Sequence, residues 1–328
     1  MKRCLYAGTL SVPDETVSFL SARGIELTNN PYGRALTEDD LCTILPGYDA
    51  VLAGLEPYTA KVMDSAPNLK IIARTGVGYD KVDVASATKR RIYVTWTPIP
   101  ELSQAVAEQT FALILSSVKR VAYLNGEVRA GKWERQTWSK GIGDLYPLTL
   151  GLLGVGRIGS EVAKRARAFQ MKTIYYDAIR MDDLESSLGI RYVPLDELFA
   201  TSDIISIHLP LTPQTRGMIN EVNIAKMKRN TIIVNTARGP IIDERALASA
   251  LEEKRLGGAA LDVLTEEPPT ENHVFYKLGD RIPGLIITPH MGFGTPTANA
   301  IFLAAAADVA RVLAGQDPVY PLNKWPLG

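Results

Sequence analysis

The sequence predicts an α/β protein made of two Rossmann-like, doubly wound parallel-sheet domains, one of which is discontinuous in the chain. Three observations lead to this prediction. The chain has 328 residues, which is more than one hydrophobic core usually serves. Short apolar segments alternate with longer amphipathic ones, a pattern typical of βαβ units and a parallel sheet. A long helical segment without an internal proline separates two series of such units, and a helix of this kind could bridge two domains.

The first series of units occupies residues 1–100. Its short apolar segments are expected to be strands: 4–7, 50–54, 71–73 and 92–95. Between them, apolar residues recur at helical spacing in the segments 13–23, 37–45 and 59–65. The long helical segment follows, from about residue 101 to residue 125.

The second series begins near residue 149 and repeats the alternation. Strands are expected at 149–153, 173–176, 204–208, 231–235, 258–263 and 285–288. Helices are expected at 157–169, 196–200, 244–251 and 297–313. We therefore expect residues 101–295 to form one domain, and residues 1–100 together with 296–328 to form the other.

Charge and cysteine content exclude several classes of protein. The 36 basic residues balance 36 acidic ones without a long run of one sign, which argues against a nucleic-acid-binding surface. Cys4 and Cys42 cannot form a disulfide framework and lack metal-ligand spacing, so no metal site and a reducing, cytoplasmic compartment are expected. The first residues lack the apolar core of a signal peptide, and no uninterrupted apolar run is long enough to span a membrane.

A glycine-rich turn lies between the strand 149–153 and the helix 157–169. Gly154, Gly156 and Gly159 form a G-x-G-x-x-G sequence in the strand–turn–helix context that dinucleotide binding requires. The first glycine permits the tight turn, the second lets the backbone approach a pyrophosphate, and the third lets the helix pack on the strand. The N-terminus of the helix offers N–H groups and partial positive charge to the phosphates.

Asp177 lies at the end of the next strand, about 20 residues after the glycine-rich turn. A carboxylate at this position accepts hydrogen bonds from the adenosine ribose and repels a 2′-phosphate, so NAD is the expected cofactor. The simpler alternative is that Asp177 only starts a turn before Ala178, and the nearby Arg180 makes strict exclusion of NADP less certain.

Three later strands each deliver a chemically competent side chain to their carboxyl ends. Arg238 follows one strand, Asp262 through Glu267 follow another, and His290 follows a third. Parallel strands present these ends at one edge, where ligands bind. Arginine can hold a carboxylate with a two-donor fork, histidine can exchange a proton, and a neighbouring carboxylate favours imidazolium. Glu266 could take the place of Glu267, but the spacing from Asp262 and the adjacent Pro268 favour Glu267.

The other two histidines have simpler explanations. His208 ends a strand and is expected to be structural or a neighbour of the cofactor. His273 lies between polar residues and is expected in a solvated loop. Trp133 and Trp138 could shape the mouth of a cleft or simply pack.

These segments, together with the glycine-rich turn and the segments 75–80 and 106–108, resemble the D-2-hydroxyacid dehydrogenase family, which includes phosphoglycerate, glycerate and D-lactate dehydrogenases. The resemblance implies an NAD-dependent oxidoreductase acting on a small D-2-hydroxy acid or 2-oxo acid. Arg238 would bind the substrate carboxylate and carbonyl, and His290, paired with Glu267, would be the acid and base.

The resemblance also implies further contacts. The amides of Val77 and Gly78 would hold the substrate carboxylate, with Arg238 and His290 also touching substrate. The cofactor-binding set would comprise Gly154, Gly156, Arg157, Ile158, Gly159, Asp177, Thr236, Ala237, Arg238, Asp262, His290 and Gly292, with Asp262 at the nicotinamide end. Residues 101–295 would bind NAD, residues 1–100 with 296–328 would form the substrate domain, and a homodimer would assemble through the NAD-binding domains.

The identity of the substrate stays open at this stage. Glyoxylate, hydroxypyruvate or a similar acid is expected, and 3-phosphoglycerate is less so because the segment 53–56 offers Glu56 where phosphate-binding members often place an arginine. No C-terminal regulatory domain is expected after Gly328. Formate-oxidising relatives have Gln in place of Glu267, and phosphite-oxidising relatives have Lys in place of Val77, so neither activity is favoured. The alternative to an enzyme is a binding protein that senses nicotinamide nucleotide and recruits partners, as corepressor relatives do.

Overall fold

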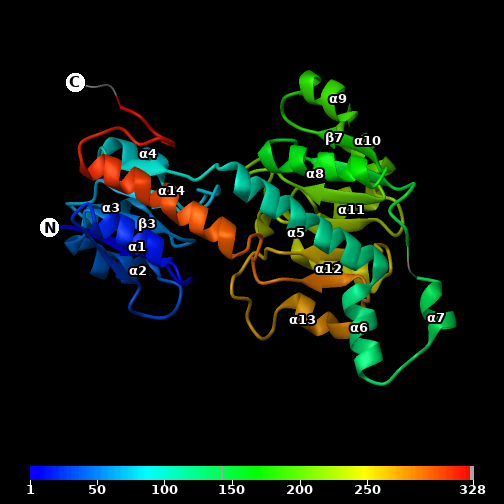
Figure 1. Cartoon of the computed structure of the whole chain (residues 1–328). Coiled ribbons are helices and arrows are strands. Elements are labelled where there is room, and N and C mark those ends of the chain that lie inside the picture. Colours follow the sequence, from blue (N-terminus) through cyan, green and yellow to red (C-terminus); the bar gives the residue numbers. More distant parts are fainter. Residues whose placement is uncertain (142, 326–328) are drawn as a thin grey trace. The chain divides into compact units, whose positions relative to one another are not determined.

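The computed structural model describes residues 1–141 and 143–325, and Figure 1 shows its elements. The chain divides into two compact units, Met1–Leu102 with Gly294–Gly328, and Ser103–Phe293. The chain thus crosses between the units after Leu102 and after Phe293.

The first unit is built on a five-stranded parallel sheet with the order β2-β1-β3-β4-β5. Its strands are β1 (Lys2–Tyr6), β2 (Ile25–Asn29), β3 (Ala50–Ala53), β4 (Ile71–Arg74) and β5 (Tyr93–Thr95). Every residue of β3 and β4 is buried, as expected for strands covered on both faces. The sequence did not predict β2, because this edge strand mixes buried and exposed residues instead of forming an apolar run.

The helices of the first unit are α1 (Asp14–Ser21), α2 (Glu38–Ile44), α3 (Ala60–Ser65), α4 (Val84–Lys89) and α14 (Thr295–Leu313). By length and composition α14 could cross a membrane, although polar residues interrupt its apolar sequence. However, Phe302, Ala305 and Val309 of α14 are buried in one hydrophobic cluster with residues of β1, β3 and β4. The contacts of α14 are therefore those of a core helix.

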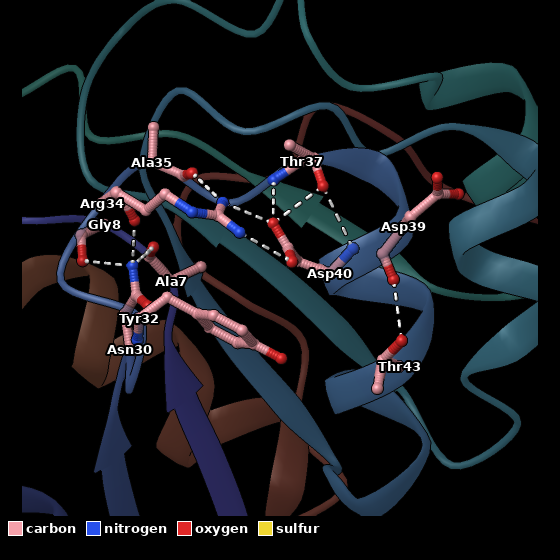
Figure 2. A network of polar contacts seen from close by, with 10 residues as sticks. All are labelled: Ala7, Gly8, Asn30, Tyr32, Arg34, Ala35, Thr37, Asp39, Asp40 and Thr43. Carbon is pink, nitrogen blue, oxygen red and sulfur yellow. Dashed lines mark hydrogen bonds and ion pairs between the residues drawn. The ribbon is translucent and has the colours of Figure 1, made fainter.

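A polar network fixes the loop that joins β2 to α2 (Figure 2). Asn30 Nδ2 donates to the carbonyl oxygens of Ala7 (3.0 Å) and Arg34 (2.8 Å). Thr37 and Asp40 form a capping box at the start of α2, and Arg34 donates to both carboxylate oxygens of Asp40. The hydrogen bond from Arg34, with those from Thr37, holds the pKa of Asp40 well below its usual range.

The second unit is built on a seven-stranded parallel sheet with the order β12-β11-β10-β9-β6-β7-β8. Its strands are β6 (Thr149–Leu153), β7 (Lys172–Tyr176), β8 (Arg191–Tyr192), β9 (Ile204–Ile207), β10 (Ile232–Asn235), β11 (Gly258–Leu261) and β12 (Leu285–Ile287). Strand order reverses between β6 and β9, which creates the switch point where open α/β sheets bind ligands. The predicted fold class, two doubly wound parallel-sheet units, is confirmed.

The helices of the second unit are α5 (Pro100–Lys119), α6 (Val121–Arg129), α7 (Arg135–Ser139), α8 (Arg157–Ala168), α9 (Asp182–Leu188), α10 (Leu195–Thr201), α11 (Glu221–Lys226), α12 (Glu244–Glu252) and α13 (Val274–Leu278). The prediction of one unbroken helix over 101–125 is wrong. Arg120 adopts the left-handed conformation (φ 54°) and separates α5 from α6, while the Gly143 N–H binds the carbonyl of Val118. No proline or glycine marks this break, so the sequence did not indicate it.

Candidate active site

The glycine-rich turn sits at the carboxyl end of β6, at the switch point of the second sheet. Gly154 has φ +93°, and a Cβ atom there would lie 2.9 Å from the carbonyl oxygen of His208. A Cβ atom on Gly159 would lie 2.2 Å from the carbonyl oxygen of Gly154. Both positions therefore require glycine, the first for its left-handed backbone and the second for close packing of α8 on the turn.

The space beside this turn fits a dinucleotide phosphate. Gly156 is exposed, and a Cβ atom there would meet no heavy atom within 4 Å. Gly156, the N-cap of α8, makes no side-chain cap hydrogen bond, and the first N–H groups of a helix, which have no acceptor within the helix itself, suit a phosphate. Asp177 follows β7; its Oδ2 accepts from the N–H of Val155 (2.9 Å) and its Oδ1 from that of Ala178 (2.7 Å). The carboxylate thus ties the end of β7 to the turn and starts the turn at Ala178 as well.

Arg180, near Asp177, forms ion pairs with acidic side chains. Its Nε lies 2.7 Å from Glu185 Oε1 and 2.9 Å from Asp182 Oδ1, and its Nη2 lies 3.1 Å from Glu185 Oε2. Tyr175 donates to Glu185 as well (3.0 Å). These contacts direct the guanidinium toward α9 and leave Asp177 as the charged group bonded to the turn.

A histidine–carboxylate pair lies beyond the ends of β11 and β12. His290 Nδ1 is 2.8 Å from Glu267 Oε2, and the two side chains are 31% and 27% exposed. The N–H of Leu264 donates to the other carboxylate oxygen (2.8 Å). Burial raises the pKa of Glu267, but the hydrogen bond and charge of His290, with smaller effects from Leu264 and Arg238, outweigh it and lower the pKa. Because Nδ1 is engaged, Nε2 is the ring nitrogen left to exchange a proton with a ligand.

The backbone of His290 is strained. Its φ of +54° is left-handed, a conformation that costs a residue with a side chain about 1–2 kcal/mol. Its N–H donates to the carbonyl oxygen of Asp262 (2.8 Å), and the next N–H, of Met291, donates to Asp262 Oδ1 (3.0 Å). Asp262 thus holds the turn that presents the imidazole, and such strain is often found at functional sites.

Asp262 is in turn held by α5. It is 2% exposed, and Oδ1 accepts from Thr288 Oγ1 (2.5 Å) and lies 3.5 Å from Gln109 Nε2. Gln109 also donates to Thr288 (3.2 Å). Sequence reasoning missed Gln109, since 153 residues separate it from Asp262 and a lone glutamine on a helix carries no signal.

Arg238 follows β10 at the same edge of the sheet. The buried Asn235 side chain donates to the carbonyl oxygen of Arg238 (2.9 Å) and accepts from the N–H of Ala237 (2.9 Å), which fixes this turn. Thr236 Oγ1 lies 3.0 Å from Thr110 Oγ1 of α5. The sequence did not predict this bracing role of Asn235.

The remaining histidines differ in environment. Desolvation lowers the pKa of His208 to about 3, and its Nε2 lies 2.9 Å from Ser206 Oγ, so it stays neutral beside the glycine-rich turn. The expectation of a solvated His273 is wrong. His273 is 9% exposed, its Nε2 lies 3.2 Å from Glu244 Oε2, and it caps the start of α13. The polar residues beside it in the sequence do not indicate this burial.

In the first unit, the expected carboxylate-binding residues Val77 and Gly78 lie in the loop after β4. Among the described residues, no acceptor is within hydrogen-bond distance of either N–H group. Glu56, in the loop after β3, is 5% exposed, so its carboxylate is part of the unit's interior and not a surface charge.

Comparison with known proteins identifies the family. A family model described as "D-isomer specific 2-hydroxyacid dehydrogenase, NAD binding domain" matches residues 111–292. A glyoxylate reductase of Korarchaeum cryptofilum is 44% identical over 246 residues, 74% of this chain and 72% of that protein. A D-3-phosphoglycerate dehydrogenase of Methanocaldococcus jannaschii is 40% identical over 284 residues, 86% of this chain but 53% of that protein. The solved structure of a glyoxylate reductase from Paecilomyes thermophila matches with a TM-score of 0.84 at 30% identity, covering 98% of each chain. The chain therefore belongs to the D-isomer specific 2-hydroxyacid dehydrogenase family and is an NAD-dependent oxidoreductase that transfers hydride between NAD(H) and a 2-hydroxy or 2-oxo acid.

Proposed function

We propose that this enzyme reduces glyoxylate, or a 2-oxo acid of similar size such as hydroxypyruvate, with NADH. The observation that carries the proposal is the Glu267–His290 pair, in which the imidazole has one nitrogen engaged by a carboxylate and the other available. The match to a glyoxylate reductase over 98% of that chain supports the choice of a small acid. By contrast, the chain spans only about half of the phosphoglycerate dehydrogenase relative.

Bound NADH supplies the hydride for the carbonyl carbon. Arg238 binds the substrate carboxylate and its carbonyl oxygen, since a guanidinium presents two donors in a fixed plane. Its charge stabilises the negative charge that develops on the carbonyl oxygen as the reaction proceeds. The Asn235 side chain supports this role by fixing the backbone on both sides of Ala237 and Arg238.

His290 then delivers the proton from Nε2 to the developing alkoxide. Glu267 accepts the Nδ1 hydrogen bond, which orients the ring and stabilises the imidazolium before transfer. In the oxidation direction the neutral imidazole takes the proton back at the same nitrogen. The N–H groups of Val77 and Gly78 bind the substrate carboxylate, and Asp262, held by Thr288 and Gln109, positions the nicotinamide end of the cofactor.

The segment 53–56 argues for an unphosphorylated substrate. It contains no arginine or lysine, and its single charged side chain, Glu56, is buried. A phosphate group would therefore find no cation from this segment.

We also propose a cytoplasmic homodimer formed through the NAD-binding units. Neither α6 nor α7 contains a buried residue, and Val121, Val128 and Trp133 are 55%, 42% and 74% exposed. Figure 1 shows these two helices joined by an extended loop at the end of α5. Apolar side chains exposed on such an arm favour burial against a second copy.

The test is the loss of NADH absorbance with a panel of 2-oxo acids: glyoxylate, hydroxypyruvate, pyruvate and 3-phosphohydroxypyruvate, each with NADH and with NADPH. We expect the largest kcat/KM for glyoxylate or hydroxypyruvate with NADH. A larger value for the phosphorylated acid would contradict the substrate assignment. Tight NADH binding without turnover of any acid would instead favour a nucleotide-sensing protein.

A further inference from the structure

Two oppositely charged side chains are buried in the first unit next to the loop 75–79, and the proposed chemistry uses neither. Arg74, the last residue of β4, is 4% exposed, and Glu56 is 5% exposed. Tyr58, which contacts Glu56, is fully buried. Burying two charges has a large desolvation cost, and apolar residues of similar size often give a more stable core. Stability alone therefore does not explain why they are present.

The guanidinium of Arg74 holds two backbone carbonyls at the carboxyl edge of the sheet. Its Nε donates to the carbonyl oxygen of Gly78 (2.8 Å), and its Nη1 donates to that of Ala53 (2.6 Å). One side chain thus connects the end of β3 to the loop that follows β4.

Glu56 is fitted into the same edge. It accepts hydrogen bonds from the N–H of Gly54 (2.8 Å) and the hydroxyl of Tyr58 (3.4 Å). A Cβ atom on Gly54 would lie 2.7 Å from Glu56 Oε1, so glycine at 54 leaves the space that the carboxylate fills. Burial raises the pKa of Glu56, while the charge of Arg74 and the hydrogen bonds act in the opposite direction.

The loop 75–79 is fixed through its carbonyl groups. The carbonyl oxygen of Gly76 accepts from the N–H of Thr97 (3.1 Å), and that of Gly78 accepts from Arg74. In a trans peptide the carbonyl and the following N–H point in opposite directions. Anchoring these two oxygens turns the N–H groups of Val77 and Tyr79 away from their anchors. It also fixes the backbone on both sides of the Val77–Gly78 peptide, whose N–H is the second expected carboxylate donor. In the described chain none of these three N–H groups has an acceptor. A Cβ atom on Gly76 would also meet no atom within 4 Å.

We propose that Arg74 is a positioning residue for substrate binding: by holding the Gly78 carbonyl, and by placing a positive charge behind the loop 75–79, it prepares the loop N–H groups to receive the substrate carboxylate. Glu56, buried at the same edge, supplies a compensating negative charge. The inference rests on the proposed function, since it requires a carboxylate ligand at this loop.

The test compares Arg74→Met with the double variant Arg74→Met/Glu56→Gln. The single variant leaves the Glu56 carboxylate buried without its partner and should be the less stable of the two. The double variant removes both charges and should recover stability. If Arg74 positions the loop, KM for glyoxylate and the inhibition constant of oxamate, a carboxylate-bearing analogue, should stay raised about tenfold or more in both variants. The Kd for NADH, measured by fluorescence without substrate, should be unchanged, and kcat should change much less than KM.

Arg74→Lys and Asp49→Ala complete the set. Lysine keeps the positive charge but has a single ammonium group in place of the planar guanidinium, so Arg74→Lys should retain part of the oxamate affinity that Arg74→Met loses. Asp49 accepts from the N–H of Arg3 (2.9 Å) near the start of β1 and β3, at the opposite edge of the sheet. Its alanine variant should be destabilised, with KM and oxamate inhibition as in the wild type.

Two results would overturn the inference. One is a double variant whose KM returns to the wild-type value together with its stability, since Arg74 would then have only a structural role. The other is an equal rise of KM in Asp49→Ala. A wild-type enzyme that neither reduces any 2-oxo acid nor binds oxamate is a different result, because it removes the proposed function and this inference with it.

Discussion

At the scale of single residues, the contact between Glu267 and His290 supports the proposed role of the imidazole as proton donor in reduction. The carboxylate of Glu267 stays ionised because its pKa is lowered by the neighbouring His290 and, to a smaller extent, by Leu264 and Arg238, against the effect of burial. This carboxylate, 2.8 Å from Nδ1, orients the imidazole and leaves Nε2 for the substrate.

The variant Glu267→Gln tests this pairing. Glutamine keeps the size of the side chain but removes the negative charge that lies 2.8 Å from His290 Nδ1. We expect kcat/KM for 2-oxo acid reduction to fall by about tenfold or more, while the Kd for NADH stays as in the wild type. Unchanged kcat/KM in the variant removes Glu267 from the mechanism.

We propose that the choice of cofactor depends on Asp177. Its carboxylate, anchored by the N–H groups of Val155 and Ala178, would face the 2′-phosphate of NADP as a like charge. Asp177→Ala should therefore lower the preference for NADH over NADPH by about tenfold or more, measured as the ratio of dissociation constants. Arg180→Ala serves as the control, because Arg180 is paired with Glu185 and Asp182 and its loss should leave the ratio nearly unchanged. Equal NADH and NADPH affinity in the wild type contradicts this account of Asp177.

At the scale of elements, parallel strands explain why much of the candidate site could be expected from the sequence. Residues that directly follow buried parallel strands share one edge, so Gly154, Asp177, Arg238 and His290 could be assigned to it without knowing the strand order. Side chains that reach this edge from a helix carry no such signal. Gln109, which supports Asp262 from α5, became visible only when the packing of α5 was known.

Several of the elements that the sequence did not predict lack an apolar run. The edge strand β2 and the helices α7 and α9 have few or no buried residues, so their sequences show no periodic pattern of apolar residues. The burial of His273 and of the Arg74–Glu56 pair depends on partners in other elements. Such contacts follow from tertiary packing, which local sequence does not determine.

The start of α2 carries a prediction about acid stability. Arg34 and Thr37 lower the pKa of Asp40 relative to its ordinary 3.8, so the folded state binds a proton there less readily than the unfolded chain. The stabilisation is present above pH 3.8 and is lost as pH falls further. In Asp40→Asn, the free energy of unfolding should therefore decrease less steeply below that pH than in the wild type.

Asp39→Asn is the matched control for this measurement. Asp39 is the next residue along α2, its side chain is 85% exposed, and it pairs with Lys61. Its variant should keep the steep wild-type dependence below pH 3.8 in urea unfolding followed by circular dichroism. If the two variants behave alike, the network of Figure 2 does not set the acid stability of this loop.

At the scale of the whole molecule, the fold class followed from alternation and length, while assembly depends on surfaces that the sequence pattern does not reveal. The break at Arg120 separates α6 from α5 and leaves an arm, residues 121–139, whose two helices bury no side chain. An arm of this kind is stable only with a further contact, which a second copy of the chain could supply.

Sedimentation equilibrium tests the proposed dimer. The wild type should sediment as a dimer, and Trp133→Glu should shift it toward the monomer because a charge would replace an aromatic side chain that is 74% exposed. Val222→Glu is the control, since Val222, on α11, is 68% exposed and lies outside the arm. A monomeric wild type, or dissociation by both variants alike, contradicts assembly through the arm.

The most direct test of the central claim is the rate of glyoxylate reduction by NADH in His290→Gln, measured beside the NADH dissociation constant of the same protein. The account predicts that kcat/KM falls by about 10²–10⁴-fold, the usual contribution of a general acid, while NADH binds as in the wild type. Retention of wild-type kcat/KM in His290→Gln would contradict the assignment of His290 as the proton donor and, with it, the proposed mechanism.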